Sequence, residues 1–200
     1  HRFELIPLLA VRPRDVMRGL LEYQPHVLHF AGHGSPTEGI VLEDDSGNTK
    51  LVSADALAQL FAVIKDNLRV VLLNACFVGQ QAEGISKVID FTIGMQKTIG
   101  DKAAIVFSSS FYEALAYGRS VKEAFDYGVT GLTMEGIPES KTPTLMERAG
   151  VNGALVRLAA PTAKAPRIKL PKAPELPRGD QHGNVIITDS RFDVEGDPTI

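Results

Sequence analysis

The chain has 200 residues, of which 44% are hydrophobic and 22% are charged. These proportions are typical of one globular domain with a sizeable core and room for a short appendage, and they exclude a disordered chain. The formal charge of -3 and the sequence pI of about 6.0 provide no basic surface, so neither nucleic acid nor an anionic membrane is expected as a partner.

The cysteine content and the apolar patterning bear on the compartment in which the protein works. One cysteine cannot form an internal disulfide, and the chain does not open with a basic leader followed by an apolar stretch. The most apolar windows, such as residues 70–73, are far shorter than the roughly 20 residues that cross a bilayer. We therefore expect a cytoplasmic protein with no membrane-spanning segment.

Strand and helix patterns alternate over the first two thirds of the chain. Short apolar runs are typical of buried parallel strands, and apolar residues three or four positions apart indicate helices. Ser120 and Glu123 have the spacing of a helix-capping box. The alternation predicts an α/β fold with a mainly parallel sheet, in which sites lie at the carboxyl ends of strands. The predicted strands are residues 3–9, 27–31, 40–43, 50–52, 70–73 and 89–95, and the predicted helices begin near Pro13, Ser53, Gln81, Asp101 and Ser120.

The composition changes near Ala159. Residues 159–180 are dense in proline and lysine and have no hydrophobic period, which predicts an extended linker after a domain that spans residues 1–158. Residues 181–200 contain one predicted strand, at residues 185–188, but too few apolar residues for a core of their own. The role of this last segment stays open.

Two residues that can carry chemistry follow predicted buried strands. His33 follows residues 27–31, and Cys76 follows residues 70–73. Neighbouring parallel strands lie about 4.8 Å apart, so side chains at adjacent strand ends come within reach of proton transfer. A nearby imidazole lowers the pKa of a thiol or accepts its proton, and main-chain amides, here those of Gly34 and Cys76, can bind an oxyanion. The pattern indicates a nucleophile and its base, with a buried cysteine and a structural histidine as the alternative interpretation.

Two other clusters have the composition of metal sites. His26 and His29 point to opposite faces of an extended strand, which argues against a shared site with His33 and favours a hydrogen-bonded core role for His29. Residues 43–45 (Glu-Asp-Asp) are interpreted as a solvated hairpin tip, with a calcium ion or a basic partner as the functional alternative. No metal is predicted.

Nucleotide and serine chemistry are not supported by the sequence. Gly79 and Gly84 have the glycine spacing of a phosphate loop, but Ile85 and Ser86 follow where lysine and serine or threonine are required. Residues 108–110 (Ser-Ser-Ser) lie within a predicted helix and have no G-x-S-x-G elbow. No organic cofactor is expected.

Two motifs resemble the signatures of CHAT domains, bacterial relatives of caspases, metacaspases and separase: HFAGHG at residues 29–34 and VLLNAC at residues 71–76. The similarity continues in order to about residue 135. It implies a caspase-like three-layer α/β/α sandwich, a general acid/base role for His33, an acyl-enzyme on Cys76 and an oxyanion amide from Gly34. Caspase-like domains usually have a further strand and helix before the segment that starts here at His1, so the resemblance implies that this first unit is missing and the chain is truncated or processed.

The resemblance also bears on substrate choice. In metacaspases an acidic residue two positions before the nucleophile helps a pocket accept lysine or arginine, and here that residue is Asn74. Basic specificity is therefore not implied, but the position makes Asn74 a candidate for contact with the substrate residue before the cut. Asp101, at the exit of the predicted strand 89–95, is the second candidate that could supply the charge, but its position favours a cap of the helix that begins there. Asp90 lies at the wrong end of that strand.

As a whole, the resemblance implies a cysteine endopeptidase that cleaves a protein or peptide substrate in a bacterial signalling or defence pathway. Regulation by a sensor or effector partner, or by an attached sensor module, is part of this expectation. The alternative is a catalytically silent caspase-like adaptor that acts by protein–protein binding. The presence of both His33 and Cys76 favours the enzyme, because a scaffold does not need that pair.

Overall fold

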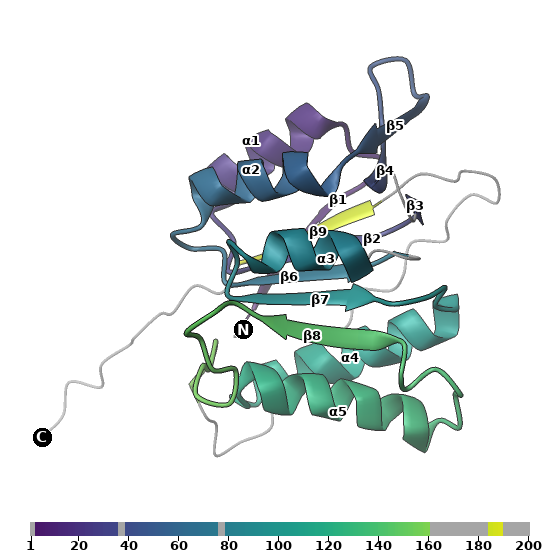
Figure 1. The fold of residues 1–200 in the computed structure, drawn as a ribbon, viewed down its shortest axis with the longest axis vertical. Coiled ribbons are helices and arrows are strands. Elements are labelled where there is room, and N and C mark those ends of the chain that lie inside the picture. Colours follow the sequence, from purple (N-terminus) through teal and green to yellow (C-terminus); the bar gives the residue numbers. More distant parts are fainter. Residues whose placement is uncertain (1–2, 36–38, 76–78, 161–183, 190–200) are drawn as a thin grey trace, which may run out of the picture.

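The computed structural model describes residues 3–35, 39–75, 79–160 and 184–189, which form one six-stranded sheet, one three-stranded sheet and five helices (Figure 1). The strands are β1 (Glu4–Leu8), β2 (Val27–Ala31), β3 (Gly34–Ser35), β4 (Gly39–Glu43), β5 (Thr49–Val52), β6 (Val70–Asn74), β7 (Phe91–Met95), β8 (Pro143–Glu147) and β9 (Asn184–Asp189). The helices are α1 (Pro13–Tyr23), α2 (Ala54–Ile64), α3 (Gly79–Ser86), α4 (Asp101–Ala116) and α5 (Val121–Met134).

The large sheet has the strand order β1-β9-β2-β6-β7-β8. Strands β2, β6 and β7 pair in parallel, whereas β9 is antiparallel to both β1 and β2, and β8 is antiparallel to β7. Strands β1, β2, β6 and β7 therefore point the same way, and the mainly parallel sheet predicted from the sequence is confirmed. Every residue of β6 and β7 is buried, as expected for strands covered on both faces.

Helices cover both faces of the large sheet, which gives the three-layer α/β/α sandwich that the caspase-like resemblance implies (Figure 1). Successive residues of a strand face opposite layers, so Leu28 and Phe30 pack with α1 and α2, while Val27 packs with α4 and α5. Strand β6 divides in the same way, with Val71 and Leu73 on the first side and its other buried aliphatic residues on the second. Two apolar cores result, one on each face.

Most predicted elements are confirmed with small shifts at their ends. The hairpin is formed by β4 and β5, and the Ser53 side chain caps α2 by accepting a hydrogen bond from the Ala56 amide. The capping box is also present, because Ser120 Oγ accepts from the Glu123 amide at 3.2 Å and Glu123 Oε2 accepts from the Ser120 amide at 2.9 Å. None of the helices in the described ranges is long and apolar enough to cross a membrane.

The sequence did not predict one strand of the large sheet, or the place of another in the strand order. Strand β8 was not predicted, and it lies at the sheet edge beside β7. Strand β9 corresponds to the predicted strand near the end of the chain, and it lies between β1 and β2, with Ile187 opposite both Ile6 and Leu28. The predicted linker at residues 159–180 falls almost wholly outside the described residues, so the domain boundaries stay predictions.

Candidate active site

His33 lies where the chain leaves the carboxyl end of β2. The backbone before it is held by the Gly32 amide, which donates to the main-chain oxygen of Asn74 at 3.2 Å. The His33 carbonyl accepts a hydrogen bond from the Val41 amide at 3.0 Å, which ties the loop to β4. The His33 side chain is exposed. The main chain is therefore fixed on both sides of an imidazole that solvent can reach.

Cys76 itself lies outside the described residues, but the strand that leads to it is described up to Ala75. Strands β2 and β6 are direct neighbours, and Ala31 is paired with Asn74 at their carboxyl ends. His33 is two residues beyond Ala31, and Cys76 is two residues beyond Asn74 in the sequence. Both predicted dyad residues thus follow paired positions by the same number of residues, at the same edge of the sheet.

Gly34, the predicted oxyanion donor, is the first residue of β3. It pairs with Ile40 of β4 in the small sheet, so the segment after His33 is built into a hairpin arrangement. The small sheet continues from β4 to β5 and lies beyond the carboxyl end of β2. The oxyanion role of Gly34 stays a prediction.

Asn74 is the last residue of β6, and its side chain turns towards α4. Its Nδ2 donates to Ser108 Oγ at 2.5 Å and to the Ala104 carbonyl at 3.3 Å. Asn74 is only 7% exposed and Ser108 only 8% exposed. Sequence reasoning placed Ser108 correctly inside a helix but missed this contact. The signal is the i, i+4 spacing of Ala104, Ser108 and Tyr112, which places small and polar groups on the sheet side of α4.

Asp101, the second candidate for substrate binding, is the first residue of α4 and is exposed. The prediction that it caps this helix is wrong. The N-cap is Gly100, which has an extended backbone and makes no side-chain cap, and whose amide donates to Glu139 Oε2 at 2.9 Å. Asp101 instead places a carboxylate in the first turn, where the helix dipole favours negative charge. Its contact with substrate stays a prediction.

Asp90 lies at the opposite edge, just before β7, as the sequence predicted. Its Oδ1 accepts from Arg148 Nε at 3.0 Å and from Arg148 Nη2 at 2.6 Å. Its Oδ2 accepts from Arg69 Nε. Arg69 precedes β6 and Arg148 follows β8, so the carboxylate joins the amino ends of two strands to the end of a third. Arg148 was not anticipated from the sequence, because it is 58 residues away.

His29 is a core residue of β2, as predicted, and is 5% exposed. Its ring lies 5.7 Å from the ring of Tyr112 on α4, and burial lowers the pKa of His29 to about 4. The expected hydrogen bonding is not borne out at Nε2, which has no partner among the described residues. His29 is therefore neutral at physiological pH and lies beneath the strand-end edge that carries His33.

The described residues contain no group of three histidine, cysteine or acidic side chains that could hold a metal ion. The acidic side chains of the hairpin instead form hydrogen bonds with nearby protein groups. Asp44 Oδ1 accepts from the Ser46 and Asn48 amides at 2.8 and 2.9 Å, and these bonds lower the pKa of Asp44. Asp45 Oδ1 accepts from Arg12 Nη1 at 3.3 Å. These contacts favour the structural interpretation of the hairpin tip.

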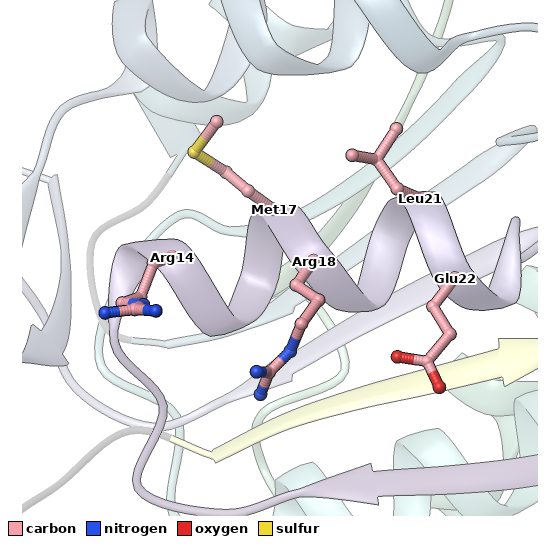
Figure 2. A pocket seen from close by; sticks show the side chains of 5 residues that line it. All are labelled: Arg14, Met17, Arg18, Leu21 and Glu22. Carbon is pink, nitrogen blue, oxygen red and sulfur yellow. The ribbon is translucent and has the colours of Figure 1, made fainter.

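Two surface hollows lie on the face covered by α1 and α2. One is lined by α1 alone, where Met17 and Leu21 point to one side of the helix and Arg14, Arg18 and Glu22 to the other (Figure 2). The second, about 430 Å³, lies between α1 and α2 and is mostly apolar. Neither hollow is lined by a predicted site residue, so neither belongs to the strand-end edge.

The structure is an α/β sandwich in which a histidine follows one parallel strand and the neighbouring strand leads to a cysteine. The model of the CHAT domain family matches residues 9–127, which is more than half of the chain. The chain therefore belongs to the CHAT domain family, and the resemblance drawn from its two motifs is confirmed.

Two curated relatives carry protease names. A "Roc-COR-CHAT protease" from an unknown prokaryotic organism is 23% identical over 118 residues, which is 56% of this chain and 11% of the relative. A "Probable protease" of Gillisia limnaea is 29% identical over 108 residues, which is 52% of this chain and 19% of the relative. The chain spans less than a fifth of the length of either relative.

Proposed function

We propose that this chain is the peptidase domain of a cysteine endopeptidase, with Cys76 as nucleophile and His33 as general acid/base. The observation that carries the proposal is the register of β2 and β6, in which Ala31 opposite Asn74 sets both residues at equal distances along the chain beyond one sheet edge. Membership of the CHAT family and the protease names of two relatives support the same activity.

The proposed reaction follows the chemistry of a thiol beside an imidazole. His33 accepts the thiol proton, and the thiolate sulfur of Cys76 attacks the carbonyl carbon of the scissile peptide bond. Main-chain amides of Gly34 and Cys76 bind the oxyanion of the tetrahedral intermediate. The imidazolium then protonates the leaving amine, and an acyl-enzyme remains on the sulfur. Water attacks this thioester while His33 acts as base, which releases the acid product and the free thiol.

The geometry around His33 is suited to this role. A general acid/base must exchange protons with both the nucleophile and the leaving group, so its ring needs access to the site while its backbone stays fixed. The exposed side chain and the two main-chain hydrogen bonds that flank it meet both needs. The proposed reaction needs no metal or organic cofactor, because the thiolate supplies the nucleophile directly.

The test is a proteome-wide search for new amino termini in extracts treated with the protein. We expect a defined set of termini with the wild type and none with Cys76→Ala or His33→Ala. Lys102→Ala, a change at an exposed residue near the start of α4, is the control that should reproduce the wild-type set. The same termini from Cys76→Ala would overturn the proposal. Unchanged biological activity of that variant would favour a silent adaptor.

We further propose that the peptidase works in the bacterial cytoplasm and is switched on by a sensor or effector module. The name of one relative joins CHAT to Roc and COR, which supports attachment to further modules. The test compares the cleavage rate of this chain alone with the rate of the chain joined to such a module. A higher rate in the joined protein is expected, and equal rates would overturn the regulatory proposal.

A further inference from the structure

A buried polar contact lies directly beneath the proposed catalytic edge. Asn74 ends β6, and its amide nitrogen has two hydrogens, which point to Ser108 Oγ and to the Ala104 carbonyl. The carbonyl is only an acceptor, so the nitrogen of the amide, and not its oxygen, must face α4. Both donor hydrogens of the side chain are therefore used by one helix, and Asn74 has little exposed surface left for a substrate.

The main chain of Asn74 contacts the turn that carries His33. The Asn74 carbonyl accepts from the Gly32 amide at 3.2 Å, and Gly32 immediately precedes His33. Asn74 thus joins three parts of the molecule: the end of β6 that leads to Cys76, the turn that carries His33, and the middle of α4. The main-chain bond is available to any residue at this position, whereas the two bonds to α4 are made by the side-chain amide of Asn74.

The bonds to α4 restrict the end of β6 more than the strand pairing alone does. Strand β6 is paired with β7 only from Val70 to Leu72, whereas its pairing with β2 continues to Asn74. The last two residues of β6 therefore lie beyond the paired part of β7, and the bonds to Ser108 and Ala104 hold this end against the layer of helices. Loss of a buried hydrogen bond of this kind leaves a buried polar group without a partner, which is unfavourable.

We propose that Asn74 is a positioning residue, whose side chain fixes the end of β6 against α4 and so sets the place of Cys76 relative to His33. This inference rests on the proposed function, because it assigns a role within the same dyad. It replaces the expectation that Asn74 contacts the substrate residue before the cut. Ser108 shares the role, because it accepts the shorter of the two bonds.

The test measures the reactivity of Cys76 with iodoacetamide as a function of pH. Cys76 is the only cysteine in the chain, so the alkylation rate reports on this thiol alone. Ser108→Ala removes one of the two partners of the Asn74 amide without changing a residue at the catalytic edge, and Asn74→Ala removes both bonds. Ser109→Ala is the matched control, since Ser109 Oγ bonds to the Ile105 carbonyl of its own helix at 2.6 Å.

We expect the wild type to react with an apparent pKa below the ordinary cysteine value of about 8.5. Ser108→Ala and Asn74→Ala should move the apparent pKa towards that value and lower the alkylation rate at pH 7 by roughly threefold or more, which corresponds to a shift of about half a pKa unit. With a peptide substrate, kcat should fall while KM and the preferred residue before the cut stay unchanged. The double variant should match Asn74→Ala, because both changes break the same contact.

Three outcomes would overturn parts of this account separately. A wild-type thiol that titrates like that of His33→Ala would overturn the dyad, and the positioning role with it. A wild type with a lowered thiol pKa that Ser108→Ala leaves unchanged would overturn the positioning role alone. A changed preference for the residue before the cut in Asn74→Ala would return Asn74 to the substrate pocket. Ser108→Ala decides the question even if Asn74→Ala does not fold.

Discussion

The amino edge and the carboxyl edge of the parallel sheet, where its strands begin and end, carry polar residues of different kinds. At the amino ends of β6 and β7, Asp90 accepts hydrogen bonds from Arg69 and Arg148, so the charges compensate one another and tie strands together. At the carboxyl ends, His33 is exposed and Asn74 is buried against α4. The first edge is joined by ion pairs, and the second carries the exposed His33 and the strand end that leads to Cys76, the two residues proposed as the catalytic dyad. In open α/β sheets, sites lie at the carboxyl edge.

This contrast separates stability from chemistry. A change at Asp90 should alter the free energy of unfolding and leave the reactivity of Cys76 unchanged, whereas a change at the exposed His33 should do the opposite. A change at Asp90 or at His33 that alters both properties together would contradict this division.

His33→Ala is expected to have the largest effect. Loss of a general acid/base lowers turnover by about 100- to 10,000-fold. The melting temperature should stay close to that of the wild type, because a change at an exposed side chain usually alters stability by no more than about 0.5 kcal/mol. Peptidase kinetics and calorimetry on the same sample check both parts. A variant that loses activity only because it unfolds would contradict the assignment of His33 to the functional edge.

Asp90→Ala should act on the other edge. Removal of the carboxylate leaves Arg69 and Arg148 without their shared partner, and we expect a loss of about 2 kcal/mol in the free energy of unfolding by urea titration. The two guanidinium groups are partly exposed, which keeps the loss below that of a fully buried pair. Asp126→Ala, which breaks an exposed pair with Lys122, is the control and should cost under about 1 kcal/mol. An altered alkylation rate of Cys76 in Asp90→Ala would contradict the contrast.

Because His29 is buried, we expect the stability of the protein to depend on pH. Burial lowers its pKa to about 4 in the folded state, while the unfolded chain titrates at about 6.5. Between these values the unfolded state binds more protons, so stability falls as the pH drops through 6.5 towards 4 and is fully present above 6.5. The loss between pH 7 and pH 5 should be about 2 kcal/mol. Urea titrations at both pH values check this, and His29→Phe should remove most of the difference; an equal difference in that variant would assign the effect to other groups.

Ser120→Ala is expected to have the smallest effect. The change removes one side of the capping box of α5, and loss of an N-cap costs about 1 kcal/mol. Ser120 lies in neither the Asp90 network nor the Asn74 contact, so activity should follow the wild type at temperatures where the variant is folded. A melting curve checks the stability, and a large loss of activity in the folded variant would show that the two properties are coupled through α5.

The parallel strands at the centre of the fold could be predicted from the sequence because each has a local apolar pattern. Strands β2, β6 and β7 are short, mostly apolar runs, and a run of this kind suits a strand buried on both faces. The same reasoning placed His33 and Cys76 beyond the ends of β2 and β6. The site prediction therefore depended on strand ends rather than on any contact between side chains.

The outer strands could not be predicted in the same way. Strand β8 begins with Pro143 and is only partly buried after it, so its pattern lacks the long apolar run of a central strand. The place of β9 depends on the gap between β1 and β2, which no local pattern around residues 184–189 reveals. The contact of Asn74 with Ser108 joins residues 34 positions apart, and only the packing of α4 on the sheet brings them together.

The most direct test of the central claim is capture of the acyl-enzyme. The protein is mixed with a peptide ester or amide substrate, quenched in acid within the first turnover, and digested for mass spectrometry. The account predicts an acyl group on Cys76 in the wild type and far less of it in His33→Ala at the same time point. Turnover of the substrate with an unmodified Cys76 at every time point, or with the acyl group on another residue, would contradict a cysteine peptidase built on this sheet edge.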